Sequence, residues 1–461
     1  MPIAWTPLLA DGPAALYDKI LSALERDIRS GQLAGGVRLP PQRELAFALG
    51  VSVGTVTKAY VEAELRGLVE GQVGRGTFVA HGLGPRAADE VESSLAVDLS
   101  INNIPLQLAA KRMAESLSSA KGRADYLDIL ACAPAMGFVE HRLACATWLG
   151  RIAGLEVDAS RVIMGHGAQH AMSLVLGHLA APGDTVLCEA ATYFGLKALA
   201  EHGRFSLRGV GLDEQGLRPD ALERAARQTG AKVLFAMPTA QNPTGRTMSQ
   251  QRRRDIAEVA RRCDLWVIED DVYGLFWPGM TPPTPLAALI PERVFYLSGV
   301  SKALAPGLRT GFTLCPTGDH FQALVRTLQA TMRTGSSYGD LFFTQWVEDG
   351  SAFEIALAVR QEIAERVVLA RDILDLPPSP SQAPHIWLEL SELQSERLVS
   401  RAARAGVLLT PADASIVAGD PICGVRVCLG GPSTRDHLTV GLRRLASAMT
   451  HPSDFRDVAM V

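Results

Sequence analysis

Apolar residues recur with a helical period near the start of the chain. They stand four positions apart, at Leu16, Ile20, Leu24 and Ile28. This spacing predicts an amphipathic helix that ends at Gly31. Two shorter helices are expected over 42–49 and 52–66, with Gly50 in the turn between them, followed by two short strands over 68–80.

From about residue 99, short apolar runs alternate with helical stretches. Six runs have the length and composition of strands: 162–164, 185–188, 233–236, 266–268, 294–297 and 313–315. Because continuous apolar strands between helices are typical of sheets buried on both faces, we expect a mostly parallel sheet with helices on both faces. After about residue 351 the sequence predicts a long helix, strands at 385–390 and 425–429, a helix at 396–405 and a final helix.

These patterns divide the chain into three parts. Residues 1–80 are expected to form a first domain. Residues 81–98 carry Gly, Pro, Ser and charges without a period, which is typical of a linker. Residues 99–461 are expected to form an α/β unit, whose smaller α+β part begins at about 351.

Composition and charge exclude several classes of protein. Hydrophobic residues make up 47% of the 461 and the net charge is −4, so the chain forms a core and is no polybasic nucleic-acid coat. Seven cysteines without a CxxC pair argue against a disulfide framework or a cysteine zinc site. The first residues lack a basic region and no apolar run reaches about 20 residues. We therefore expect a cytoplasmic protein without a signal peptide or membrane span.

The first domain has the features of a helix-turn-helix followed by a wing of two strands. Ala46 is small where two helices would cross, and Gly50 permits the positive φ of the turn. The stretches RLPPQRELAFALGVSVGTVTKAY and GLVEGQVGRGTFVA resemble the winged helix-turn-helix of the GntR family. This resemblance implies binding of double-stranded DNA through Arg43, Ser52, Thr55 and Lys58, with Arg75 in the wing.

A winged helix that binds protein is the alternative for this domain. Residues 1–80 hold eight Lys or Arg and eight Asp or Glu, so their charges sum to zero, whereas DNA-binding modules are usually basic. The position after Ser52 is often basic in GntR relatives, but it is Val53 here.

The segment YLSGVSKALAPGLRTGF, residues 296–312, carries the candidate chemistry of the second unit. Lys302 follows an apolar strand in a turn rich in Ser and Gly, and Arg309 comes seven residues later. A lysine and an arginine so placed suit a phosphate-bearing carbonyl cofactor, with the lysine forming a Schiff base and the arginine binding the phosphate.

Four further segments follow predicted strands at their carboxyl ends, where open α/β sheets bind ligands. Gly167-Ala168-Gln169 could bind phosphate at a helix N-terminus, and Tyr193 could stack on a pyridine ring. Asn242, in QNPTG, could hydrogen-bond a phenolic oxygen, and Asp270, in EDDVY, could keep a pyridine nitrogen protonated.

Together these segments resemble pyridoxal-phosphate enzymes of fold type I, the aspartate aminotransferase-like class, over roughly residues 99–450. The resemblance implies pyridoxal 5'-phosphate on Lys302, with Asp270 at the ring nitrogen, Asn242 and Tyr273 at the ring oxygen, Tyr193 stacked on the ring, and Arg309, Ala168 and Gln169 at the phosphate. It implies that Tyr126 reaches the phosphate of a neighbouring subunit and that Arg426, in GVRVCLG, binds a substrate carboxylate. Gly299 stands where relatives often carry a Ser or Thr phosphate ligand, so Ser298 or Ser301 would substitute.

His166 and His170 have the spacing of two ligands on one helix, but no third ligand is near them in sequence. We therefore expect no metal site.

Both halves and their order resemble the MocR subfamily of GntR regulators. This implies a homodimeric transcription regulator that senses an amine, an amino acid or the cofactor itself through an aldimine at Lys302 and changes its binding to operator DNA. The alternative is an active aminotransferase with an appended DNA-binding domain. Because Lys302, Asp270 and Arg426 serve a sensor and an enzyme equally, the sequence leaves catalysis open.

Overall fold

The computed structural model describes residues 5–9, 16–29, 32–33, 35–65, 68–72, 76–79, 96–119, 133–277, 279, 281–316, 318–332, 337–377, 379–419 and 422–450. The chain divides into two compact units, Met1–Ala96 and Val97–Val461. Arg75 and Tyr126, which were assigned to the wing and to a neighbouring subunit's phosphate, lie outside the described residues.

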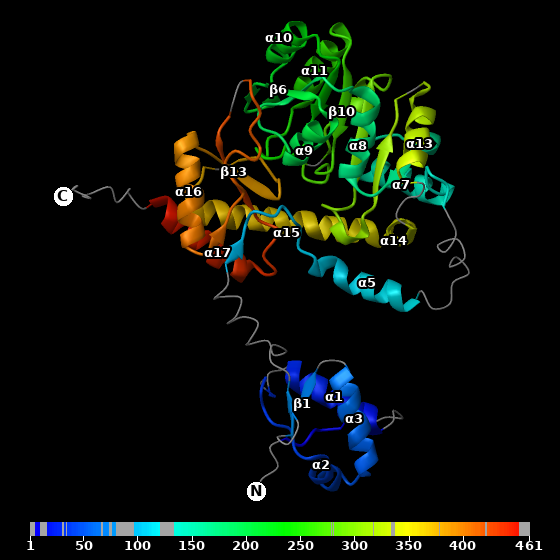
Figure 1. Ribbon diagram of the computed structural model, residues 1–461, viewed down its shortest axis with the longest axis vertical. Helices are drawn as coiled ribbons and strands as arrows, with labels where there is room; N and C mark the ends of the chain where they lie inside the picture. Colours follow the sequence, from blue (N-terminus) through cyan, green and yellow to red (C-terminus); the bar gives the residue numbers. More distant parts are fainter. Residues whose placement is uncertain are drawn as a thin grey trace, which may run out of the picture. The chain divides into compact units, whose positions relative to one another are not determined.

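The N-terminal unit contains the three helices and two strands that its pattern predicts. They are α1 (Leu16–Arg29), α2 (Gln42–Leu49), α3 (Val53–Leu65), β1 (Val69–Gln72) and β2 (Gly76–Val79), drawn in blue in Figure 1. Gly50 ends α2 at a φ of 67°, as the predicted turn requires. β1 and β2 pair antiparallel. The core of this unit includes Ile20, Leu24, Leu45 and Val56, all at most 1% exposed.

The C-terminal unit is built on a seven-stranded sheet in the order β4-β12-β11-β10-β9-β5-β6. Its strands are β4 (Val162–Gly165), β5 (Thr185–Glu189), β6 (Ser206–Val210), β9 (Val233–Ala236), β10 (Trp266–Asp270), β11 (Val294–Gly299) and β12 (Gly311–Leu314). Neighbouring strands run parallel except at β12, which is antiparallel to both β11 and β4. The mostly parallel sheet is therefore confirmed.

The strand β6 was missed because it lies at the edge of the sheet. Its first residues, Ser206 to Arg208, are exposed or half-buried, so they carry no continuous apolar run. The predicted strands are fully buried along most of their length, which is why their apolar composition revealed them.

Helices pack around this sheet (Figure 1). They are α7 (Val139–Ile152), α8 (Ala168–Leu179), α9 (Phe194–Gly203), α10 (Pro219–Thr229), α11 (Gln250–Arg262), α12 (Leu286–Leu289), α13 (His320–Thr331) and α14 (Ser337–Glu348). α8 packs against β10, β11 and β12, while α10 packs against β5 and β6. The helix α5 (Gln107–Ser119) precedes them and was not predicted.

The remaining elements form the smaller α+β part. The long helix α15 (Ser351–Leu374) packs beside α17 (Arg435–Thr450), and β13 (His385–Glu389) pairs antiparallel with β15 (Gly424–Cys428). The helix α16 (Glu392–Arg404) begins four residues before its predicted start, because Ser391 and Gln394 form a reciprocal cap there.

The predicted linker ends two residues too late. Val97–Asp98 is the strand β3, which pairs parallel with β14 (Val407–Leu408) and belongs to the C-terminal unit. A run of two residues is too short to show a period, so the strand forms only because its partner is in place.

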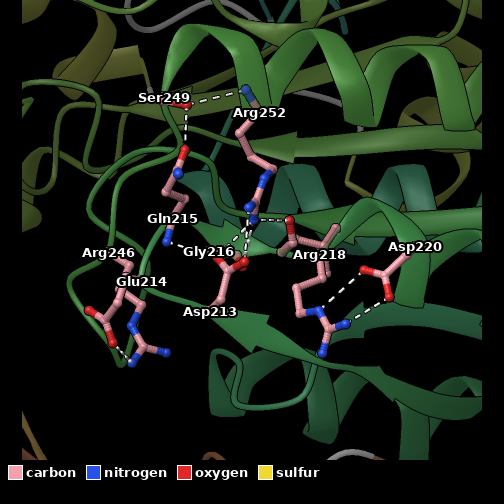
Figure 2. A network of polar contacts seen from close by, with 10 residues as sticks. Asp213, Glu214, Gln215, Gly216, Arg218, Asp220, Arg246, Ser249 and Arg252 are labelled. Carbon is pink, nitrogen blue, oxygen red and sulfur yellow. Dashed lines mark hydrogen bonds and ion pairs between the residues drawn. The ribbon is translucent and has the colours of Figure 1, made fainter.

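A network of ion pairs fixes the hairpin β7 (Leu212–Asp213) and β8 (Gly216–Leu217) to the start of α11 (Figure 2). Arg252 donates to both oxygens of Asp213 at 2.9 Å, and Ser249 caps α11 and donates to Gln215. Arg246 pairs with Glu214 at 3.1 Å. Since Arg246 directly follows the turn 241–245, this network also holds that turn, which carries Asn242.

Candidate functional site

A cavity of about 710 Å³ lies at the carboxyl ends of β9 and β10 in the C-terminal unit. Its lining includes ten of the residues that the sequence assigned to a cofactor or a carboxylate: Ala168, Gln169, Tyr193, Asn242, Asp270, Tyr273, Ser301, Lys302, Arg309 and Arg426. The cavity thus brings together residues as far apart in the sequence as Ala168 and Arg426, which are separated by 258 positions. Parallel strands bring their carboxyl ends to the same edge of a sheet, which explains this convergence for all of these residues except Arg426, which lies on β15 of the smaller part.

Lys302 lies in the turn that follows β11, and its Nζ donates to the backbone oxygen of Asn102. Burial lowers the pKa of Lys302 to about 8, although the Asp270 carboxylate opposes this effect. A substantial fraction of the amine is therefore neutral near physiological pH. A neutral amine is the form of lysine that attacks a carbonyl carbon.

Asp270 ends β10 and is 4% exposed. Its Oδ1 accepts a hydrogen bond of 3.1 Å from the Val272 amide. Burial raises the pKa of Asp270 to about 7, and the neighbouring Asp271 adds to the effect. A buried carboxyl of this kind is stabilised as the anion by a cationic partner, such as a protonated ring nitrogen.

Asn242, Tyr273 and Arg426 also line the cavity. Arg426 Nη1 donates to Asn242 Oδ1 at 2.7 Å, so the amide nitrogen of Asn242 is left to face other groups. The Tyr273 hydroxyl accepts a hydrogen bond of 2.9 Å from Asn102 Nδ2. Burial raises the pKa of Tyr273, which keeps it a neutral phenol.

Glycine shapes the part of the cavity that suits a phosphate. Gly167 caps the N-terminus of α8 at a φ of 84°, and Arg309 Nη2 donates to the His166 oxygen at 3.1 Å. A Cβ on Gly167 would lie 3.0 Å from Arg309 Nη2, and one on Gly311 would lie 2.4 Å from the Gly167 Cα. The backbone here can approach an anion closely, at a helix N-terminus that favours negative charge.

Of the two serines proposed to replace the missing phosphate ligand at Gly299, only Ser301 lines the cavity. Ser298 Oγ donates to the Asp271 oxygen at 3.1 Å and lines a separate small cavity beside Trp148. Ser298 is a residue of β11, where successive side chains point to opposite faces of the sheet. Ser301 therefore lines this cavity, and Ser298 lines the smaller one.

His170 is held within the phosphate region. Its Nδ1 accepts a hydrogen bond of 3.2 Å from the His166 amide, and burial lowers its pKa to about 4. Within the described part of the chain, no three His, Cys, Asp or Glu side chains gather as metal ligands do.

Sequence reasoning missed three neighbours of the cavity. Arg426 Nη2 donates to the Ser100 oxygen at 2.9 Å and to Thr410 Oγ1 at 3.0 Å, and Asn102 contacts both Lys302 and Tyr273. The three missed residues are Ser100 and Asn102, which follow the short strand β3, and Thr410, which follows β14. No motif or hydrophobic period marks them, so no signal in the sequence would have found them.

In the N-terminal unit, the residues assigned to DNA gather near the helix-turn-helix. Arg43 is exposed on α2, and Ser52 and Thr55 are at the start of α3, where Ser52 Oγ accepts the Thr55 amide at 3.1 Å. The Lys58 amine lies 3.7 Å from the centre of the Tyr17 ring. Lys58 is therefore engaged with α1 through a cation–π contact.

The donor set of the cavity fits pyridoxal 5'-phosphate. It combines a half-buried lysine whose amine is partly neutral, a buried carboxyl, a buried phenol, and a glycine cradle beside Arg309 at a helix N-terminus. Gln169 Oε1 is buried without a partner among the described residues, so the cradle also retains an unused polar atom.

The fold and the cavity define a two-part protein, with a winged helix-turn-helix and an aminotransferase-like unit. The chain belongs to the aminotransferase class I and II family, whose model matches residues 96–444. Residues 16–79 match the model of the bacterial regulatory proteins of the gntR family, so the chain has the architecture of MocR-type GntR regulators. No described helix is both long and apolar enough to cross a membrane.

Similar proteins include regulators and enzymes. The uncharacterized HTH-type transcriptional regulator YdeF of Bacillus subtilis (strain 168) is 27% identical over 463 residues, which cover 97% of this chain and 98% of YdeF. The HTH-type pyridoxine biosynthesis transcriptional regulator PdxR of Corynebacterium glutamicum is 29% identical over 322 residues, or 69% of each chain. The crystal structure of Pyrococcus horikoshii kynurenine aminotransferase with PMP, KYN and KYA superimposes with a TM-score of 0.71 at 25% identity, covering 79% of this chain and 93% of that one.

Proposed function

We propose that this protein is a transcription regulator that binds operator DNA through its N-terminal unit and senses a small amine through its C-terminal cavity. The observation that carries the proposal is the convergence of Lys302, Asp270 and Arg309 in one cavity, on a chain that also has a winged helix-turn-helix. The names of YdeF and PdxR as transcriptional regulators support it. We expect a homodimer, because helix-turn-helix operators usually consist of two half-sites.

The cavity residues would hold pyridoxal 5'-phosphate at its two ends. Arg309 and the N-terminus of α8 would bind the phosphate, Asp270 would hold a proton on the ring nitrogen, and Tyr193 would cover the ring. When bound, the cofactor supplies an aldehyde that reacts with primary amines and a ring that withdraws electrons.

The remaining residues would recognise the effector. Lys302 provides a half-buried amine that an incoming amine would replace, and Arg426 offers a guanidinium to a carboxylate. An effector changes DNA binding only if it binds one arrangement of the protein more tightly than the other. An amino acid that engages Arg426 and displaces Lys302 makes contacts that the cofactor alone does not make, which provides such a difference.

The test measures DNA binding with and without ligands. DNA selected by the wild-type protein from a random pool serves as the operator, and fluorescence anisotropy gives its affinity alone, with pyridoxal 5'-phosphate, and with the cofactor plus each common amino acid. We expect at least one ligand to change the affinity about 5-fold or more. Lys302→Ala should bind the DNA as the wild type does, without a response to ligand. Lys111→Ala, at a 90% exposed side chain, is the matched control. A full response in Lys302→Ala would overturn the proposal.

A working aminotransferase is the second candidate function, because the lowered pKa of Lys302 also suits catalysis. The test adds an amino acid to the cofactor-loaded protein, then a keto acid, and follows the absorption spectrum. Repeated conversion of both compounds would show an enzyme. A spectrum that changes once and persists until the amino acid is removed would favour a sensor. A change in DNA affinity with the cofactor alone would instead indicate a sensor of the cofactor.

A further inference from the structure

A series of buried hydrogen bonds links the Tyr273 hydroxyl to the backbone of Gln241. Asn102 Nδ2 contacts the Tyr273 hydroxyl at 2.9 Å and His385 Nδ1 at 2.8 Å. His385 Nε2 contacts the backbone oxygen of Gln241 at 3.0 Å. The four residues come from four separate segments, and none is more than 8% exposed. Such a chain restricts the orientation of every group in it.

The direction of each hydrogen bond follows from the last acceptor in this series, the backbone oxygen of Gln241. A carbonyl oxygen only accepts, so His385 Nε2 carries a proton and donates it. Burial, with the nearby positive charges of Arg426 and Lys302, lowers the pKa of His385 to about 3, so the imidazole is neutral. Its Nδ1 is then an acceptor, and Asn102 must face it with the amide nitrogen.

The same assignment fixes the proton of Tyr273. One hydrogen of Asn102 Nδ2 goes to His385 and the other to the Tyr273 oxygen, so Tyr273 receives a hydrogen bond from Asn102. The phenolic proton has to point elsewhere, and Tyr273 lines the cavity. If the Asn102 amide were turned over, its oxygen would face Tyr273 and capture this proton.

We propose that Asn102 and His385 are positioning residues that keep the Tyr273 hydroxyl a hydrogen-bond donor to an oxygen atom of the ligand in the cavity. Asn102 serves the site twice, because its backbone oxygen also accepts from Lys302 Nζ. This inference rests on the proposed function, since it assumes that the cavity binds a ligand with an acceptor oxygen, such as the phenolic oxygen of a pyridoxal compound.

The tautomer of His385 tests the assignment in the protein without ligand. In protein labelled with 15N-histidine, the His385 signals are identified by their loss in His385→Leu, and their shifts report which nitrogen carries the proton. We expect the Nε2–H tautomer, neutral, from pH 6 to 8. A protonated Nδ1 in the wild-type protein would overturn the proposal without reliance on any variant.

Asn102→Asp should change the protonation state of His385. Aspartate places an acceptor opposite His385 Nδ1, while the Gln241 carbonyl still requires a proton on Nε2. His385 should then carry both protons and become an imidazolium at neutral pH. Asn103→Asp, one residue away and outside this chain of bonds, should leave His385 neutral. A neutral His385 in Asn102→Asp would contradict the proposal.

Ligand affinity tests the role in positioning. His385→Leu should weaken the binding of pyridoxal 5'-phosphate about 10-fold, the effect of one misdirected buried hydrogen bond, as measured by the change in protein fluorescence. His385→Asn, which can return an acceptor to Asn102, should recover most of the loss. Equal affinity in His385→Leu, with wild-type circular dichroism, would overturn the proposal. DNA binding is measured separately by fluorescence anisotropy. A protein whose DNA affinity does not respond to ligand would contradict the proposed function, whereas the tautomer and affinity measurements test the role of Asn102 and His385.

Discussion

Arg426 Nη1 donates a hydrogen bond of 2.7 Å to Asn242 Oδ1, across 184 residues of sequence. Arg426 Nη2 is held by the Ser100 oxygen and Thr410 Oγ1, whereas its Nε has no partner among the described residues. The guanidinium is therefore fixed before any ligand arrives, and it orients the amide of Asn242. A fixed cation in a buried wall favours ligands that carry a carboxylate.

Arg426→Lys should weaken the binding of amino acids more than the binding of amines that have no carboxylate. Lysine keeps the charge but loses the planar pair of donors, so the affinity of the cofactor-loaded protein for L-alanine should fall about 10-fold or more. Affinity for ethylamine, which has no carboxylate, should stay within about 2-fold of the wild type by the same reasoning. Titrations followed by visible absorption compare the two ligands, with Arg252→Lys, in the network of Figure 2, as the control. An equal loss for both ligands would show that Arg426 does not bind the carboxylate.

Gly311→Ala should damage both stability and phosphate binding. Its Cβ would lie 2.4 Å from the Gly167 Cα, so two backbone segments must separate, at a cost of about 3 kcal/mol. Gly177→Ala is the matched control, because nothing lies within 4 Å of its Cβ. In helix α8 this control should raise stability by about 0.5–1 kcal/mol. Urea unfolding followed by circular dichroism measures both variants, and similar midpoints for the two would refute the prediction.

Asp340→Asn should stabilise the protein increasingly as the pH rises. Burial raises the pKa of Asp340 from 3.8 to about 7, and its Oδ1 accepts from Thr310 Oγ1 at 2.8 Å. Between these pKa values the folded state holds a proton that the unfolded state has lost, so wild-type stability falls as the pH rises through this range. Asparagine removes this dependence.

Thermal unfolding at pH 5 and pH 8 measures the effect of Asp340→Asn. The change in unfolding free energy caused by the substitution should be more favourable at pH 8, by about 2 kcal/mol. Asp372→Asn, at an exposed residue of α15, provides the control. A change that is equal at both pH values would mean that Asp340 does not titrate in this range.

Arg43→Ala should weaken DNA binding in a salt-dependent manner. Arg43 is exposed on α2, and a contact with phosphate would release about one counterion. The slope of log affinity against log salt concentration should therefore fall by about 1. Lys58→Ala should change the slope less, because the Lys58 amine lies over the Tyr17 ring. Arg224→Ala, on α10 of the other unit, should leave the slope unchanged. An unaltered slope in Arg43→Ala would remove Arg43 from the interface.

The sequence by itself determined the local elements and the candidate chemistry. The apolar runs that form β9, β10 and β11 are nearly fully buried, and burial on both faces is what a continuous apolar run records. Lys302, Asp270 and Asn242 could be placed together from the sequence, because each lies at or beyond the carboxyl end of a strand of a mostly parallel sheet.

Only the tertiary structure decided which atoms meet. It placed Ser301 in the large cavity and Ser298 in a separate small one, and it paired Asn102 with Tyr273 and His385, which are 171 and 283 residues away. A hydrophobic period reflects the environment of neighbouring residues along one segment, so it carries no information about such distant polar partners. Those hydrogen bonds form because the packing of the two parts of the unit leaves buried donors and acceptors that must satisfy one another.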